Sequence, residues 1–170
     1  CISDHGNHRV LLYNAIPLTS GAGANLVIGQ LDFLSGSPGV GTNRLSNPTA
    51  SFANGSLYVA DKGNHRILKW NTLPTTSGAG ASIVLGHGNF TANTLNDANG
   101  DGLYSPGQAI VVNGKLIAAD SFNHRVLIWN SLPTFNGQSA SVVLGQSSFN
   151  TTGSGLSSTR FSNPNAVASD

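Results

Sequence analysis

The triplet Asn-His-Arg occurs three times in the chain, each time within a longer stretch of repeated sequence. The copies start 57 and then 59 positions apart, and an aspartate stands three positions before each of them. Repetition at such a period indicates stacked copies of one supersecondary unit. The repeated motif consists of Asp4, Asn7, His8 and Arg9, then Asp61, Asn64, His65 and Arg66, then Asp120, Asn123, His124 and Arg125.

The similarity between the copies extends over almost the whole chain. After each triplet come an apolar run, an aromatic residue, a proline, a glycine and a phenylalanine, in the same order. The aromatic residues, which we interpret as core between units, are Tyr13, Trp70 and Trp129. The repeats span about 1–48, 49–106 and 107–164 as one propeller segment, with 165–170 starting a further unit.

Each unit contains four short runs of β-forming residues and no helical periodicity. In the second unit the expected strands are Thr49–Ala53, Leu57–Ala60, His65–Trp70 and Ser82–Leu85, with a hairpin turn at Asn54-Gly55. Four antiparallel strands in each unit are typical of a propeller blade. The sequence therefore predicts an all-β chain of three four-stranded blades, the first of which lacks its inner strand.

The pattern Asp-x-x-Asn-His-Arg-(Val/Ile)-Leu resembles the NHL repeat, and Leu-Gly-Gln-x-x-Phe at 144–149 resembles bacterial secreted proteins of that family. The resemblance implies a propeller that usually has six blades, so that three blades are half of a ring. It also implies an extracellular or periplasmic location. Because that family contains binding scaffolds and a few enzymes, it leaves the function open.

Alignment of the repeats places Cys1 in the second strand of its blade and Asn165–Ser169 as an inner strand without the rest of a blade. Two bare strand edges would promote aggregation. We therefore expect a partner: a second copy that associates head to tail into a six-bladed homodimer, or further blades of a longer chain. The first of these is slightly favoured because two times three matches six.

Three repeated histidines suggest zinc, but the geometry of a ring opposes it. Equivalent positions on neighbouring blades lie more than about 10 Å apart, whereas zinc binds nitrogen at about 2 Å. We expect each His to have the same structural role in its own blade. For the repeated Asp we expect hydrogen bonds from N–H groups two or three residues on, and for the Arg a pairing with this Asp or with a neighbouring blade.

One segment between repeats departs from the pattern. Asp97, Asn99 and Asp101 place side-chain oxygens at positions 1, 3 and 5, as in the opening of a calcium loop. Position 12 is Gln108 instead of a bidentate Glu, and the flanks are not helical, so that an EF-hand is excluded. A looser calcium site is the one cofactor that the sequence suggests.

The net charge and the motifs of the chain limit the classes of function that we expect. With a net charge of +1 and only 9% charged residues, the chain carries no basic field for nucleic acid, and it has no apolar run long enough for a membrane span. The inner strands carry no His, Asp or Glu, and we find no catalytic motif. We expect a non-catalytic module that binds protein or glycan ligands. Two alternatives stay open: a lactonase-like or lyase-like enzyme with a metal in the central channel, and a structural subunit of an extracellular assembly.

Overall fold

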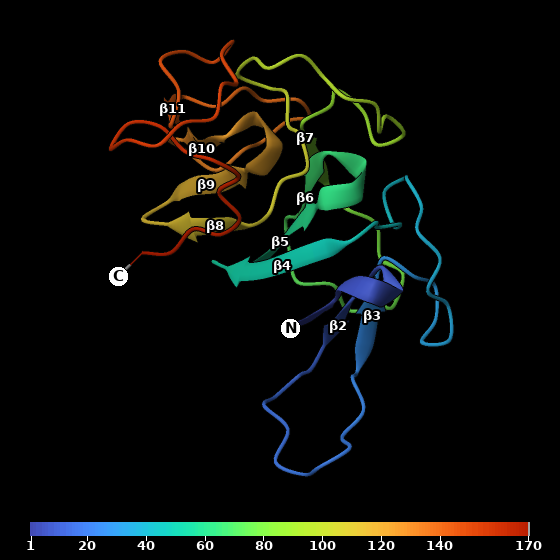
Figure 1. Cartoon of the computed structure of the whole chain (residues 1–170). Helices are drawn as coiled ribbons and strands as arrows, with labels where there is room; N and C mark the ends of the chain where they lie inside the picture. Colours follow the sequence, from blue (N-terminus) through green and yellow to red (C-terminus); the bar gives the residue numbers. More distant parts are fainter. Residues whose placement is uncertain (170) are drawn as a thin grey trace.

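The computed structural model describes residues 1–169, which form three antiparallel sheets that lie side by side in chain order (Figure 1). The first sheet has three strands, and the second and third have four each, arranged in the order of the sequence. The strands are β1 (Ile2–Asp4), β2 (Arg9–Leu12), β3 (Leu26–Ile28), β4 (Pro48–Ala53), β5 (Ser56–Asp61), β6 (Arg66–Trp70), β7 (Ile83–Leu85), β8 (Ala109–Val112), β9 (Lys115–Asp120), β10 (Arg125–Trp129) and β11 (Val142–Leu144). The fold is all-β, and the sheets are blades of the β-propeller type.

Local sequence sets the turns within each blade. Asn54 and Gly55 have φ of 51° and 74°, the left-handed conformation that a two-residue hairpin turn requires. Between the second and third strands of the blades lie three-residue 3-10 turns: η1 (His5–Asn7), η2 (Lys62–Asn64) and η3 (Ser121–Asn123). His65 ends η2 with φ of 55°, so that β6 begins at Arg66, one residue later than expected.

The second sheet is buried on both faces because a blade packs against each of them. Side chains on β5 alternate: Leu57 and Val59 join the core shared with the first sheet, and Tyr58 joins the core shared with the third. This alternation is the normal two-residue period of a strand. Leu57 and Tyr58 are both fully buried, so that each sheet-to-sheet junction is a closed apolar layer.

The inner strands β4 and β8 are neighbours, and the Ser51 hydroxyl donates to the Ala109 carbonyl at 2.5 Å. In the third sheet the Gly107 N–H donates to the Ala119 carbonyl, and the Ala119 N–H donates to the Gln108 carbonyl. Two residues thus lie opposite one, which defines a β-bulge. The bulge accommodates the one additional residue that the third repeat has between its proline and its aspartate.

The first sheet lacks an inner strand, as expected, and β1 is its edge. The strand expected at Asn165–Ser169 is not formed in the described chain, because its neighbours there are loop and side-chain atoms instead of a second strand. The Val167 N–H, for example, donates to Oε1 of Gln108 at 3.1 Å. Asp170, the last residue of the further unit expected to start at 165, lies outside the described residues. No helix within 1–169 has the length and apolar character that crossing a membrane requires.

Candidate functional site

The repeated aspartate of the second blade is the centre of a buried polar corner. Oδ2 of Asp61 accepts from Nε of Arg66 at 2.7 Å and from Nδ2 of Asn64 at 2.8 Å. Oδ1 accepts from the Ser46 N–H at 2.6 Å. The Asp61 and Arg66 side chains are fully buried. The corner therefore ties the segment that precedes β4 to the turn that follows β5.

The guanidinium of Arg66 extends this corner to three backbone carbonyls. Nη1 donates to Phe90 at 2.5 Å, and Nη2 donates to Gly41 at 2.9 Å and to Arg44 at 3.0 Å. A planar fork of five donors suits such a set of fixed acceptors. The arginine thus fixes the loops on both sides of its blade, in addition to pairing with Asp61.

The third blade repeats this geometry. Asp120 accepts from Arg125 at 2.7 Å and from the Tyr104 N–H at 2.7 Å, again with both ionic side chains fully buried. Nη2 of Arg125 donates to the carbonyls of Asn99 and Gly102 at 3.0 and 2.9 Å. In both corners the Asp and Arg side chains bind backbone groups at equivalent positions of the repeat.

The aspartates do not cap their own turns, contrary to the expectation from sequence. In none of η1, η2 and η3 does the side chain of the N-cap aspartate accept a hydrogen bond from a backbone N–H of the turn. The physical reason is that Ser46 and Tyr104, from the loop before the inner strand, provide the N–H that Asp61 and Asp120 accept. Burial raises the pKa of both carboxyls, and the nearby arginine charge opposes this shift.

The repeated histidines contact the following blade. Nδ1 of His8 accepts from the Asn47 N–H at 3.1 Å, and Nδ1 of His65 from the Ser105 N–H at 3.2 Å. Nδ1 of His124 accepts from the Asn163 N–H at 3.1 Å. Each donor residue has a positive φ and leads into an inner strand or its equivalent. The motif therefore uses Asp and Arg to hold the start of its own blade, and His to hold the start of the next.

The same corner in the first blade is half open. Asp4 accepts from Arg9 at 2.7 Å and from Asn7 at 3.0 Å, but the side chains of Arg9 and Asp4 are 17% and 24% exposed. These bonds from Arg9 and Asn7 hold the pKa of Asp4 below its ordinary value. Arg9 also donates to the Phe33 carbonyl at 2.5 Å.

His87 replaces a glutamine of the other repeats. Gln30 and Gln146 donate from Nε2 to the His8 and His124 carbonyls at 3.2 and 3.1 Å. Nε2 of His87 lies 3.1 Å from the Asn64 carbonyl, and Nδ1 lies 3.2 Å from Nδ2 of Asn96. Burial lowers the pKa of His87, which favours the neutral ring that these two contacts need.

Sequence reasoning missed an aromatic cluster between the second and third blades. Tyr104 packs edge-to-face on His65 at 5.2 Å and on Phe122 at 5.0 Å between ring centroids. Both Tyr104 and Phe122 occupy repeat positions that hold Ser and Gly elsewhere, namely Ser46 and Gly63. That joint departure from the repeat is the signal that identifies the cluster.

The suggested calcium loop is part of the Arg125 corner. Oδ1 of Asn99 accepts from the Asp101 N–H at 3.2 Å and the Gly102 N–H at 2.6 Å, and the Asn99 carbonyl accepts from Arg125. The Asn99 oxygen thus stabilises the turn itself. Within residues 1–169 no group of three or more His, Cys, Asp and Glu side chains is placed to hold a metal. Calcium binding through Asp97 and Asp101 stays a prediction.

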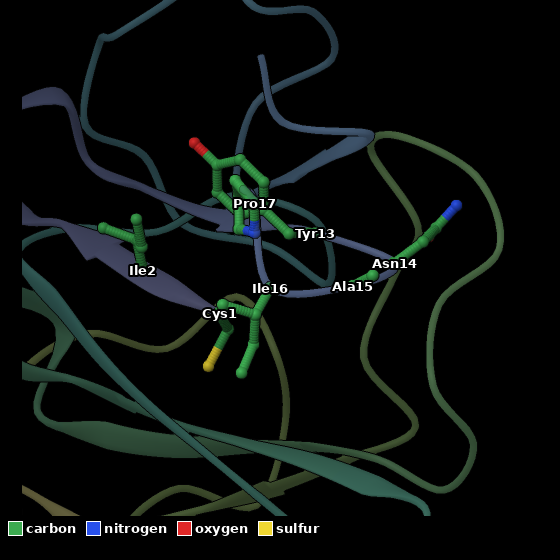
Figure 2. Close-up of a pocket in the computed structure, with 7 residues that line it drawn as sticks. All are labelled: Cys1, Ile2, Tyr13, Asn14, Ala15, Ile16 and Pro17. Atoms are coloured by element: carbon green, nitrogen blue, oxygen red, sulfur yellow. The ribbon is translucent and has the colours of Figure 1, made fainter. Parts of the chain in front are cut away.

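The first blade has a hollow of about 430 Å³ on its open side, lined by Cys1, Ile2 and 13–17 (Figure 2). A second hollow beside it, of about 240 Å³, extends to Phe52 and Leu57. The lining is mostly apolar, and its ionisable side chains among the described residues are the Cys1 thiol and the Tyr13 phenol. These hollows resemble an uncovered packing surface more than a reaction site.

In a comparison with protein families, residues 47–70 match the NHL repeat. This segment contains β4, β5 and β6 and the repeated motif of Asp61, Asn64, His65 and Arg66. The search of curated proteins finds no match to the chain. The match at 47–70, together with the same motif in the first and third units, indicates repeats similar to the NHL repeat, folded as blades of the β-propeller type.

Proposed function

We propose that the chain is a non-catalytic propeller module that binds protein or glycan ligands. The observation that carries this proposal is the use of the repeated polar motif. Asp61, Arg66, Asp120 and Arg125 are buried and bonded to loop backbone, so that these residues stabilise the junctions between blades. The geometry that the three repeats share thus holds the loops in place, whereas the loop sequences differ from one repeat to the next.

The surface best suited to a ligand is the end of the blades that carries the 3-10 turns. We call it the turn face; it consists of η1, η2, η3 and the connections 29–47, 86–107 and 145–163. Exposed apolar side chains gather there on otherwise polar loops, and such groups on a rigid scaffold are typical of binding surfaces. They are Leu31, Leu34, Leu95, Phe122 and Leu156.

A titration of purified chain with a panel of oligosaccharides and extended peptides tests the proposal. Phe122→Ala should weaken binding of a ligand about tenfold, since an exposed aromatic anchor contributes on the order of 1–2 kcal/mol. The matched control is Phe135→Ala, which removes an exposed phenyl ring from the opposite end of the blades and should leave affinity unchanged. Efficient turnover of lactone, ester or sugar substrates would contradict the proposal.

The proposal includes a closed ring of six blades, with three contributed by this chain. Its support is the open edge at β1 and the half-open corner of Asp4 and Arg9, both of which are covered in the other blades. A soluble, secreted bacterial module of this kind would present the turn face outward, where extracellular glycans and proteins are available.

A further inference from the structure

The two outermost blade faces of the chain are apolar and uncovered. On the first sheet, Ile2 is 53% exposed, whereas its repeat equivalent Val59 is fully buried. On the third sheet, Val142 and Leu144 are 38% and 45% exposed, whereas the equivalent residues of β7 are buried in the junction between the second and third blades. The exposed face of the first sheet is therefore equivalent to the face of the second sheet that packs on the first. The exposed face of the third sheet is equivalent to the face of the second sheet that packs on the third.

The hydrogen-bonding groups at these two faces also correspond. In the second blade, Asp61 and Arg66 bind the Ser46 N–H and the carbonyls of Gly41 and Arg44. In the first blade, Asp4 and Arg9 are in the same positions without that loop. The repeat equivalents of the loop groups are at the other end of the chain: the Ser162 N–H and the carbonyls of Ser157 and Arg160.

Side-chain size gives a first independent match. At the inner junctions Ser46 faces Gly63, where an added Cβ would lie 2.9 Å from Cβ of Ser46, and Tyr104 faces Phe122. One junction thus pairs small with small, and the other pairs ring with ring. The two remaining residues at these repeat positions are Ser162 and Gly6, which form a pair of the small type. Gly6 has no heavy atom within 4 Å of an added Cβ, so that space for Ser162 is available.

A second position shows the same rule. The Ala81 N–H donates to the Thr42 carbonyl, and the Ala140 N–H donates to the Gly100 carbonyl. Next to these bonds a glycine faces a hydroxyl residue in both junctions, as Gly80 with Thr42 and Gly100 with Ser139. The remaining residues are Gly23 and Ser158, again one glycine and one hydroxyl residue.

The long loop after β2 supplies a third match. At the inner junctions the equivalent loops bind the outer strand of the preceding blade: Gly78 donates to the Val27 carbonyl, and Gly137 donates to the Val84 carbonyl, both at 2.9 Å. The loop of the first blade projects away from the sheets with no strand to bind (Figure 1). Its Gly21 corresponds to Gly78 and Gly137, and the free outer strand is β11, at Val143.

We propose that a second copy of this chain docks head to tail, so that residues 157–169 of each copy complete the first blade of the other. In the register of the second blade, Pro164 would lie opposite Asp4, Asn165 opposite Ser3 and Ala166 opposite Ile2, extending the sheet at β1 by strand addition. A two-fold axis makes the two junctions identical and closes the assembly. This inference rests on the six-bladed ring of the proposed function, and it identifies the other three blades of that ring as a second copy of the chain.

Sedimentation analysis of four proteins tests the pairing. The wild-type chain should have twice the 17.4 kDa chain mass, independent of concentration once the dimer is saturated. Gly6→Phe should weaken association at least tenfold and leave the circular dichroism of the monomer unchanged. Adding Ser162→Tyr should restore association, because it transplants the Tyr104–Phe122 pair to the proposed junction, where His124 takes the place of His65. Gly88→Phe is the matched control, at an exposed glycine with nothing within 4 Å of an added Cβ, and should stay dimeric.

Three results would overturn the proposal: a wild-type chain that stays monomeric at every concentration, a mass that grows without limit, and a Gly6→Phe variant that associates as tightly as wild type. Failure of the double variant to recover would overturn the pairing of Ser162 with Gly6. The ligand titration is separate from these outcomes. A monomer that binds its glycan or peptide contradicts the dimer and the six-bladed ring but leaves the binding function intact, and a dimer that turns over a lactone contradicts only the binding function.

Discussion

The Asp61–Arg66 pair is buried without exposed atoms, yet each of its charged groups has hydrogen-bonding partners. Burial of two charges costs several kcal/mol, and good geometry with additional hydrogen bonds offsets that cost. Arg66 meets three carbonyls and Asp61 meets three donors, which satisfies this condition. The pair therefore stabilises the fold by fixing the loops in place. Removal of either partner should be destabilising, because it would leave the other charge buried and unpaired.

Arg66→Met should destabilise the fold by about 3–5 kcal/mol, because it leaves the Asp61 carboxylate buried without its cation. Lys115→Met is the control: it removes the same formal charge from an exposed position at the start of β9. Its effect should stay within about 0.5 kcal/mol. Urea unfolding followed by tryptophan fluorescence measures both, and equal midpoints for the two variants would refute the role of the corner.

His87 should make stability depend on pH. Burial lowers its pKa below the ordinary 6.5, so that the unfolded chain takes up a proton more readily than the folded chain. The contribution of His87 to stability is therefore full above pH 6.5 and is lost as the pH falls through the lowered pKa. The pKa of His65 is lowered as well, by burial and by the charge of His87.

His87→Gln, which introduces the residue of the other repeats, should reduce the loss of stability below pH 6.5, since it removes a histidine whose pKa is lowered by burial. Urea midpoints measured from pH 7.5 down to about 5 test this expectation. Parallel curves for the variant and the wild type would show that His87 does not titrate on unfolding.

At the scale of elements, the outer strands β3 and β7 are each held by the loop of the following blade. The Val84 N–H donates to Oδ1 of Asn136 at 3.1 Å, and the Val27 N–H donates to the Ser77 hydroxyl at 3.2 Å. A side chain thus takes the place of a further strand, and the edge is covered without extending the sheet.

Asn136→Ala should speed hydrogen exchange at the Val84 amide about fivefold, which corresponds to the loss of one hydrogen bond of about 1 kcal/mol. The Val27 amide provides an internal control because Ser77 is intact. Unchanged exchange at Val84 would show that the loop backbone, through Gly137, protects the strand by itself.

Strands and turns could be predicted from sequence because three aligned copies show the same pattern of apolar and turn residues, which removes the ambiguity that a single short segment would leave. Asn54-Gly55 specified its hairpin, and the four strands of the second blade begin and end within one residue of expectation. The bulge at Gly107 and Gln108 was not predicted, because a single additional residue in a Gly-containing segment has no periodic signature. The partners of Asp61 were also missed, since Ser46 lies fifteen residues earlier and only tertiary structure brings it near.

For the whole molecule, the repeat predicted blades and an open inner edge, while the candidate ligand surface depended on features outside the repeat. Tyr104 and Phe122 follow no motif, and their contact is evident only when the second and third blades are placed together. The half-open corner at Asp4 also depends on the whole molecule. Its bond to Arg9 within the first blade is formed, and the two side chains are exposed only on the side where a neighbouring blade would lie.

Amide hydrogen exchange at three equivalent positions tests most directly whether the repeated motif joins blades at every junction, including the one between copies. The Ser46 and Tyr104 amides donate to Asp61 and Asp120 and should be strongly protected. In the assembled protein the Ser162 amide should be protected to a similar degree, by Asp4 of a second copy. Rapid exchange at Ser162 beside slow exchange at Ser46 and Tyr104, at concentrations where the wild type is fully associated, would contradict the account.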